Sequence, residues 1–244
     1  MLRFITAFNV LSTPRQTLVM QEAEVSSKTF VLWSGFCREV ITYWAFTTST
    51  KLGGPGKIVE IDEAKFGRRK YNVGRLIEGQ WILGGVERGS KKAFYVPVQK
   101  RDAETLIECI QKWVLLGTTI ITDCWKAYGS LKDLGYEHFT VNHKKNFVDP
   151  ETGANTNTME RSWRDAKAVV PRYGKNRKNY EHYLSEVQFR RMYPDPKIRL
   201  HQFLKIVASL PEYKAPPMST DQKTSDDTLI VRRKLILKPQ RIST

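Results

Sequence analysis

The sequence contains little of what marks several common protein classes. It has only three cysteines, Cys37, Cys109 and Cys124, and they are too few and too scattered for a disulfide framework or a CxxC zinc site. No apolar run approaches the roughly 18 residues of a membrane span, and residues 1–10 lack the apolar core of a secretory signal. We therefore expect a protein of a reducing compartment that neither crosses a membrane nor carries a secretory leader.

Acidic residues are scarce relative to basic ones. The chain has 40 Lys and Arg against 25 Asp and Glu, a net charge of +15. Most of the excess falls within residues 51–210 rather than in the last part of the chain. This pattern favours a polyanionic partner that binds a surface of the folded part, either nucleic acid or an anionic membrane. A membrane surface is the weaker alternative because no basic amphipathic helix stands out.

Residues 1–52 contain one clear helical pattern. A capping signal at Ser26 precedes apolar residues that recur at helical spacing. Two interpretations stay open: a helix that faces the core, or the second helix of a helix-turn-helix with Lys28 and Arg38 directed at DNA. The glycine-rich break at Gly53–Gly56 predicts a boundary, so we expect a truncated N-terminal helical segment over residues 1–52.

The rest of the chain reads as an α/β domain over residues 53–210. Three strands that can form a meander are followed by strands linked through helices, which predicts a mixed sheet. Strands are expected over Ile58–Asp62, Gln80–Val86, Ala93–Val98, Thr118–Thr122 and Phe139–Val141, with a basic loop over Lys65–Lys70. Helices are expected over Ala103–Val114 with Asp102 as the cap, Trp125–Leu131, Thr158–Val169, Tyr180–Met192 and Ile198–Leu210.

The proline-rich end of the chain, residues 211–244, predicts a mostly disordered tail. An alternative remains open for its two apolar triplets, Leu229–Val231 and Leu235–Leu237, which flank the basic triplet Arg232–Lys234. These segments could form a late strand or a docking segment.

Three acidic residues stand at the positions where α/β proteins build sites. Asp62 ends the first expected strand, Asp123 follows the buried fourth strand, and Glu160 lies near the start of a helix. Adjacent strand ends would bring the two aspartates together. Three carboxylates at one point repel one another, and hard divalent cations relieve that repulsion. Carboxylate oxygens suit Mg²⁺ or Mn²⁺, and two such ions can act on a phosphodiester. Each acid alone also fits a turn, a cap or a solvated face.

Basic residues near these acids predict contacts with DNA phosphates. On the expected helix from Thr158, Glu160, Trp163, Arg164 and Lys167 share one face; the plainer interpretation is a core tryptophan beside an incidental ion pair. The full set of candidate phosphate contacts, any of which could be a simple solvated charge, is Lys65, Arg68, Arg69, Lys70, Lys144, Lys145, Arg164 and Lys167.

Several blocks of the sequence resemble the Merlin transposases, eukaryotic relatives of bacterial insertion-sequence transposases with the ISXO-like DDE domain. The resemblance covers roughly residues 25–195. The blocks run over Gly53–Glu63 with Lys65–Gly67, Gly79–Trp81, Gly84–Gly89, Thr122–Tyr128, Val141–His143 with Asn146–Pro150, Glu160–Arg164 with Lys167, and Arg190–Arg191.

The resemblance implies a ribonuclease-H-like fold of the retroviral-integrase type. It implies cut-and-paste DNA transposition, in which water cleaves the transposon end and the freed 3′-hydroxyl attacks target DNA. Asp62, Asp123 and Glu160 would be the catalytic and metal-binding triad, and the family's mechanism implies two ions of Mg²⁺ or Mn²⁺. The implied partners are transposon ends and target DNA, with a homodimer expected, and a eukaryotic host would place the protein in the nucleus, another host in the cytoplasm.

The sequence departs from the family pattern in two places. Asn155 stands where members usually have histidine before the third acid, and asparagine cannot carry charge or shuttle a proton. His143, Asn155 and Asn157 are therefore candidate auxiliary residues. Family members also have a longer N-terminal region. These departures support an alternative, a domesticated transposase remnant that binds DNA and cuts it weakly or not at all.

Overall fold

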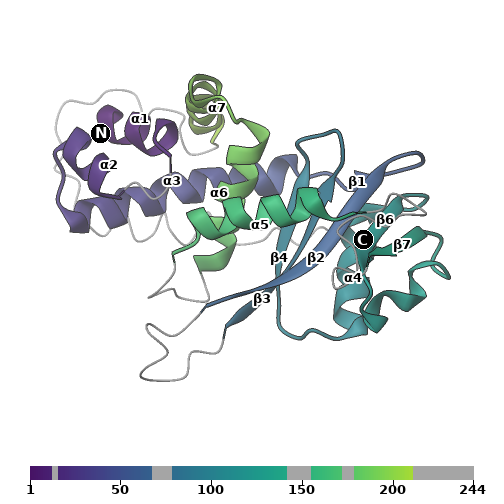
Figure 1. Cartoon of the computed structure of the whole chain (residues 1–244). Helices are drawn as coiled ribbons and strands as arrows, with labels where there is room; N and C mark the ends of the chain where they lie inside the picture. Colours follow the sequence, from purple (N-terminus) through teal and green to yellow (C-terminus); the bar gives the residue numbers. More distant parts are fainter. Residues whose placement is uncertain (13–15, 68–78, 142–154, 172–178, 211–244) are drawn as a thin grey trace.

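The computed structural model describes residues 1–12, 16–67, 79–141, 155–171 and 179–210 (Figure 1). Within them no helix is both long enough and apolar enough to cross a bilayer. The helices are α1 (Leu2–Val10), α2 (Gln16–Ala23), α3 (Ser27–Thr48), α4 (Ala103–Trp113), the 3₁₀ helix η2 (Lys126–Leu131), α5 (Asn157–Val169), α6 (Tyr180–Met192) and α7 (Pro196–Ser209). The strands are β1 (Leu52–Gly53), β2 (Ile58–Phe66), β3 (Gln80–Glu87), β4 (Ala93–Val98), β5 (Val114–Leu115), β6 (Thr119–Asp123) and β7 (Glu137–Val141).

A five-stranded mixed sheet forms the centre of the molecule, in the spatial order β4-β3-β2-β6-β7. The first three strands in chain order, β2, β3 and β4, form an antiparallel meander. The next two, β6 and β7, add to β2 in parallel. This arrangement confirms the expected mixed sheet and the ribonuclease-H-like fold. The short strands β1 and β5, which pair in parallel, were not predicted because two residues give no periodic pattern.

Helices cover both faces of this sheet (Figure 1). On one face, apolar residues of β2, β3, β4 and β6 pack with α4 and η2 in a cluster that includes Val59, Ile61, Leu106 and Tyr128. On the other face, Ala64 and Phe66 of β2 pack with α5 and α6. Successive residues of a strand point to opposite faces, so β2 divides its side chains between two differently covered surfaces.

Close packing of α5 on the sheet depends on a glycine in β3. A Cβ atom at Gly84 would lie 2.4 Å from the Met159 side chain and 2.7 Å from that of Trp163. Gly84 is also the register partner of Asp62 on β2. Because Gly84 has no side chain, α5 can pack closely on β3 beside Asp62, the first candidate acid.

Local signals in the sequence account for the helix starts. Asp102 accepts a hydrogen bond from the Thr105 amide at 2.9 Å and begins α4, as predicted. Ser26 accepts one from the Thr29 amide at 3.2 Å and begins α3. The predicted basic loop was wrong at its start, because Lys65 and Phe66 continue β2. Its residues 68–70, and the predicted tail 211–244, lie outside the described residues.

The N-terminal helices pack against the C-terminal ones. Apolar residues of α1, α2 and α3 share a cluster with Phe189 of α6 and Phe203 of α7. Arg38 faces this interior: its Nε atom pairs with Glu186 Oε2 at 2.8 Å, and its side chain is 17% exposed. The interpretation of α3 as a recognition helix with Arg38 directed at DNA is therefore wrong at that residue, and the core-facing interpretation holds. Lys28 is exposed.

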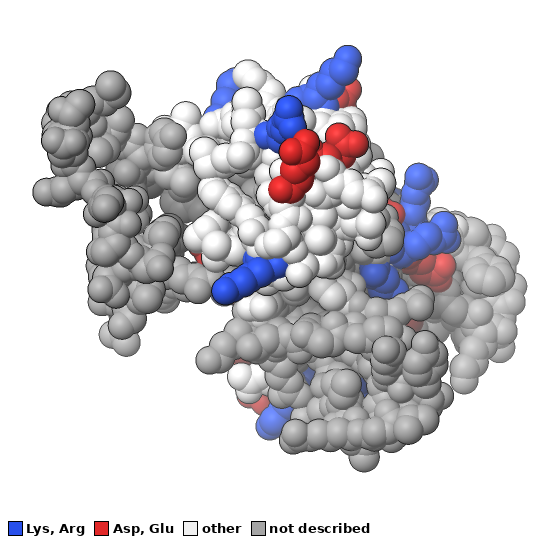
Figure 2. Space-filling model, turned by 90° about the vertical axis from the view of Figure 1, so that its left-hand side faces the viewer, with Lys and Arg blue, Asp and Glu red and all other residues white. Residues whose placement is uncertain are grey.

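Over the described residues on the face that Figure 2 shows, the surface is largely white with scattered blue and red groups. Helices α1 and α2 were not predicted, and α2 has one buried residue, Val19. The expected boundary between the N-terminal segment, residues 1–52, and the α/β domain, residues 53–210, stays a prediction.

Candidate active site

The pairing of two parallel strands brings Asp62 and Asp123 together. Strand β2 pairs with β6 from Ile58 opposite Thr119 to Glu60 opposite Ile121. The same register, continued by two residues, sets Asp62 beside Asp123 at the end of β6. The expectation that the two aspartates meet is confirmed. The prediction that Asp62 ends its strand is wrong, because β2 continues to Phe66 through its pairing with β3.

Glu63 is the third carboxylate at this point. One side-chain oxygen each of Asp62, Glu63 and Asp123 lies within 4.8 Å of the other two. At that separation, and at an effective dielectric constant of about 20, each pair of charges repels by about 3 kcal/mol. Glu63 was not among the acids predicted from the sequence to bind metal. Its position directly after Asp62 was the available signal, but strand alternation places its side chain on the opposite face of the sheet from that of Asp62.

The donor set fits a hard divalent cation. All three groups offer carboxylate oxygens, which Mg²⁺ and Mn²⁺ prefer in proteins. Asp62 and Asp123 are half-buried, so a cation can reach them from solvent. Glu63 is buried, and its Oε2 atom has no hydrogen-bond partner among the described residues. An unpaired buried oxygen beside two further carboxylates is a feature that a bound cation would resolve.

Glu63 itself is held by one arginine. Arg101 Nε donates to Glu63 Oε1 at 3.1 Å, and the glutamate side chain is 1% exposed. Burial raises the pKa of Glu63, and the hydrogen bond and charge of Arg101 oppose that rise. The Tyr128 hydroxyl lies near the same carboxylate without meeting hydrogen-bond geometry, and burial raises the pKa of Tyr128 well above its usual value.

Arg101 is sandwiched between two tryptophans. Its guanidinium carbon lies 4.0 Å from the centroid of the Trp125 ring and 4.8 Å from that of the Trp81 ring. The backbone amide of Trp125 donates to Asp123 Oδ1 at 3.1 Å. Trp125, which follows β6, thus holds Asp123 through its backbone amide and Arg101 through its ring.

Glu160 lies outside the group of three carboxylates. It is in the first turn of α5, as predicted, and its side chain is exposed. The next turn of the helix carries Trp163, which is 5% exposed and donates its Nε1–H to Asp62 Oδ2 at 2.9 Å. Trp163 is therefore a core residue, as the plainer interpretation had it, and it also fixes the orientation of the Asp62 carboxylate. Helix α5 brings Glu160 to the Asp62 side of the sheet without placing it in the cluster.

A second buried glutamate anchors the start of α5. Glu60 is fully buried on β2, and its two oxygens accept from Arg88 Nε at 2.6 Å and from the Met159 amide at 2.8 Å. Arg88 Nη2 also donates to the Asn155 carbonyl at 2.6 Å. The first amides of a helix have no partner within the helix, so a carboxylate from β2 acts there as an external cap. Sequence reasoning missed both Glu60 and Arg88.

The candidate phosphate contacts divide into three groups. Lys65 is exposed at the end of β2, with its Nζ atom 5.5 Å from the Trp81 ring. Arg164 and Lys167 are exposed on α5, on the helix that also carries Glu160. The remaining candidates lie outside the described residues: Arg68, Arg69, Lys70, Lys144 and Lys145.

The candidate auxiliary residues cluster at the start of α5 where the structure describes them. Asn155 precedes the helix, and its side-chain Oδ1 accepts from the Asn157 amide at 3.4 Å. Asn157 is the first residue of α5 and is exposed. His143 lies outside the described residues.

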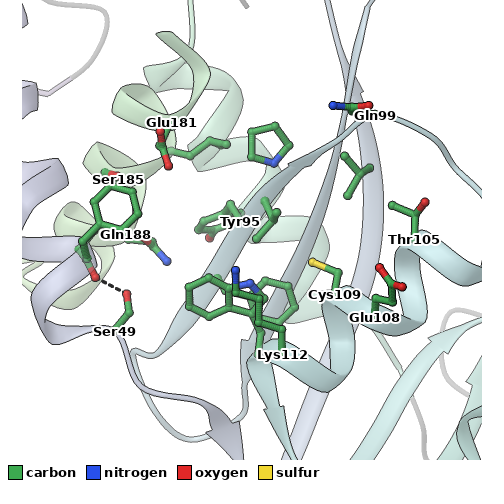
Figure 3. A pocket seen from close by; sticks show the side chains of 18 of the residues that line it. Ser49, Tyr95, Gln99, Thr105, Glu108, Cys109, Lys112, Glu181, Ser185 and Gln188 are labelled. Atoms are coloured by element: carbon green, nitrogen blue, oxygen red, sulfur yellow. Dashed lines mark hydrogen bonds between the residues drawn. The ribbon is translucent and has the colours of Figure 1, made fainter. Parts of the chain in front are cut away.

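A separate hollow of about 650 Å³ lies at the other edge of the sheet. It is bordered by β4, α4, α6 and the end of α3 (Figure 3). Its lining includes Tyr95, Cys109, Lys112, Glu181 and Gln188, and burial raises the pKa of Cys109 to about 11. Its lining does not include Asp62, Glu63, Asp123 or Glu160, so it is not part of the acidic site.

Comparisons with known proteins give one clear relationship. Two solved structures show weak similarity. A chain of the simian T-cell lymphotropic virus intasome in complex with the PP2A regulatory subunit B56 gamma is 16% identical, with a TM-score of 0.38, over 72% of this chain and 63% of that one. The NurA nuclease from Sulfolobus solfataricus is 14% identical, with a TM-score of 0.15, over 74% and 53% of the two chains.

The chain thus spans less than two thirds of the length of each of these structures. No curated protein matches the sequence. The model of the ISXO2-like transposase domain, in contrast, matches residues 51–191, which is more than half of the chain. The matched range contains Asp62, Glu63, Asp123 and Glu160. The chain belongs to the family of ISXO2-like transposase domains.

Proposed function

We propose that this protein cleaves DNA strands and joins them to target DNA in a divalent-metal-dependent reaction, as a DDE transposase of the Merlin type. The observation that carries the proposal is that Asp62 within β2 lies beside Asp123 at the end of β6. Family membership supplies the substrate class, DNA. The expected reactions are hydrolysis at a transposon end and attack of the resulting 3′-hydroxyl on target DNA.

The acidic residues would hold the metal ions. Asp62 and Asp123 are the primary ligands, and Glu160 on α5 is the third member of the triad. Bound Mg²⁺ or Mn²⁺ would supply Lewis-acid activation of the attacking oxygen and charge stabilisation at the phosphate. Trp163 keeps the Asp62 carboxylate in one orientation through its indole N–H. Glu60 and Arg88 keep the first turn of α5, and with it Glu160, against the sheet.

The basic residues would position the DNA. Arg164 and Lys167 lie on the exposed side of α5, within two turns of Glu160, where they can meet the phosphates that flank the reacting one. Lys65 would contribute from the end of β2. Such contacts fix the register of the duplex but do not read its sequence. A homodimer that holds two transposon ends, and a nuclear location in a eukaryotic host, are part of the same proposal.

A second candidate function is DNA binding without cleavage. Two observations favour it: Glu160 is outside the carboxylate cluster, and Asn155 replaces the usual histidine of the family pattern. Both candidates require the basic residues, whereas only the first requires the aspartates.

The discriminating experiment compares the wild-type protein with Asp123→Asn on labelled linear and supercoiled DNA. Each is incubated with Mg²⁺, with Mn²⁺ and with EDTA. Asp133→Asn, an exposed aspartate beyond η2, is the matched control. Nicking or strand transfer that needs metal, persists in Asp133→Asn and vanishes in Asp123→Asn supports the transposase. Salt-sensitive binding by all three proteins without any cut product supports the second candidate.

A further inference from the structure

Glu63 is a buried acid that the DDE triad does not use. Among the buried side chains that the structure describes, it supplies the one carboxylate oxygen without a hydrogen-bond partner, Oε2. Only the Glu63 Oε1 atom is held, by Arg101. A carboxylate with purely structural work normally has both oxygens satisfied when it is buried. Glu63 Oε2 therefore lacks a partner that the described residues do not provide.

The position of Glu63 indicates what that partner is. Its carboxylate shares one point with those of Asp62 and Asp123, where a fourth protein group of negative or neutral charge would not relieve the repulsion. A cation would relieve it and would also occupy the free oxygen. Two oxygens on opposite sides of one Mg²⁺ lie about 4.2 Å apart, given Mg–O distances of about 2.1 Å. At most one of the three oxygen pairs can be opposite, and adjacent oxygens lie about 3.0 Å apart. The three oxygens lie within 4.8 Å of one another, so side-chain movements of up to about 1 Å would bring them around one cation.

We propose that Glu63 is a metal ligand, and that Asp62, Glu63 and Asp123 form a cation site that is complete without Glu160. This inference rests on the proposed function, whose metal chemistry it refines. It assigns the first binding event to β2 and β6 alone, with α5 adding its acid afterwards.

Glu63 and Glu160 would approach the cation from opposite faces of the sheet. Asp62 contacts Trp163 on the α5 side, whereas its neighbour Glu63 contacts Arg101 and lies near Tyr128 on the α4 and η2 side. The sheet edge where β6 ends is the place at which side chains from both faces can meet. Because Arg101 uses only Oε1, Glu63 can offer Oε2 to a cation while its ion pair stays intact.

The competing explanation is that Glu63 exists only to hold Arg101 between the tryptophans. On that explanation, removing either partner lowers stability and leaves metal binding unchanged. On the proposal, Arg101 is a positioning residue for Glu63, and the two residues differ: loss of Glu63 weakens metal binding, whereas loss of Arg101 leaves it largely in place.

The test is a calorimetric titration of the full chain with Mn²⁺ alone, in the absence of DNA. The variants are Glu63→Gln, Glu160→Gln, Arg101→Gln and Asp123→Asn, with the exposed Glu104→Gln on α4 as the control. We expect Glu63→Gln to weaken Mn²⁺ binding by at least about tenfold and Glu160→Gln by less than about threefold. Stabilisation of the wild type by Mn²⁺ in a thermal melt should shrink in Glu63→Gln, which gives a second readout without catalysis.

The outcomes separate this inference from the proposed function. If Glu63→Gln binds Mn²⁺ like wild type while Asp123→Asn and Glu160→Gln do not, Glu63 is not a ligand and the triad stands. If Asp123→Asn also binds like wild type, the metal centre of the proposed function fails, and the inference fails with it. Should Glu63→Gln not fold, the double variant Glu63→Gln/Arg101→Gln removes the arginine that would lose its partner and answers the same question.

Discussion

Strand β2 carries two buried glutamates, in two regions, whose carboxylates differ in their hydrogen bonding. At the Glu60 region, both carboxylate oxygens have partners, one the Arg88 guanidinium and the other the Met159 amide. At the Glu63 region, three residues further along β2, one oxygen pairs with Arg101 and the other has no hydrogen-bond partner. The two sites have the same residue type, an arginine each, and similar burial.

The difference separates a group that holds the fold from a group left available for a ligand. A fully paired buried ion is costly to break, because removing one member leaves the other charged and buried. A half-paired buried acid already bears an unmet desolvation cost, so replacing it with a neutral group has a small or favourable effect on folding. Four predictions test this contrast, in order of decreasing expected effect on stability.

The largest effect is expected for Glu60→Ala. It removes the partner of Arg88 and of the Met159 amide, so unfolding in denaturant should show a loss of about 3–5 kcal/mol. Glu60→Gln keeps an acceptor for the amide and should lose less. The contrast between the regions is broken if Glu63→Gln destabilises the protein as much as Glu60→Ala does.

A smaller loss is expected for Gly84→Ala. The new methyl group would meet Met159 and Trp163 at 2.4 and 2.7 Å, so α5 must move away from β3. Overpacking of this kind costs about 1–3 kcal/mol. Gly129→Ala, where an added Cβ meets nothing within 4 Å, is the control. Equal thermal melts for the two variants would show that α5 is not tightly held.

Trp163→Phe should cost about 1–2 kcal/mol, since Asp62 is half-buried and its lost hydrogen bond is partly replaced by water. It should lower DNA cleavage more than DNA binding, because the aspartate loses its fixed orientation. Trp33→Phe on α3, far from β2, is the control for the loss of an indole ring. Unchanged cleavage in Trp163→Phe would show that the indole serves packing alone.

The smallest change is expected for Tyr128→Phe. The Tyr128 hydroxyl is buried without a hydrogen-bond partner among the described residues, so its removal should alter the free energy of unfolding by less than about 1 kcal/mol. A clear loss of stability would mean that the hydroxyl is bonded to Glu63 in solution. The Glu63 region would then resemble the Glu60 region more than the structure indicates.

Much of the fold could be predicted because its signals are local. The alternating β-branched run at Ile58–Asp62, the Asp102 cap and the apolar run before Asp123 each identify an element within a few residues. The meeting of Asp62 and Asp123 was predicted from adjacent strands, although Asp62 lies within β2 rather than at its end. Helices α1 and α2 were missed because α1 has no side-chain cap and α2 carries little apolar periodicity.

The contrast between Glu60 and Glu63 could not be predicted. Both residues are glutamates, which are rarely buried, and what buries them lies far along the chain. Glu60 accepts a hydrogen bond from Met159 at the start of α5, which is 99 residues away in the sequence. Glu63 depends on Arg101, 38 residues away. Pairings at such distances leave no mark in the local pattern, so only the assembled sheet reveals which acid is satisfied.

The parallel pairing of β2 with β6 also has a consequence for synthesis of the chain. Asp62 emerges from the ribosome long before Asp123, and the meander and α4 lie between them. The aspartates become neighbours only when β6 has paired with β2, a non-local contact. Any translation product that stops before residue 119 lacks the whole of β6. Such a fragment has no paired aspartates.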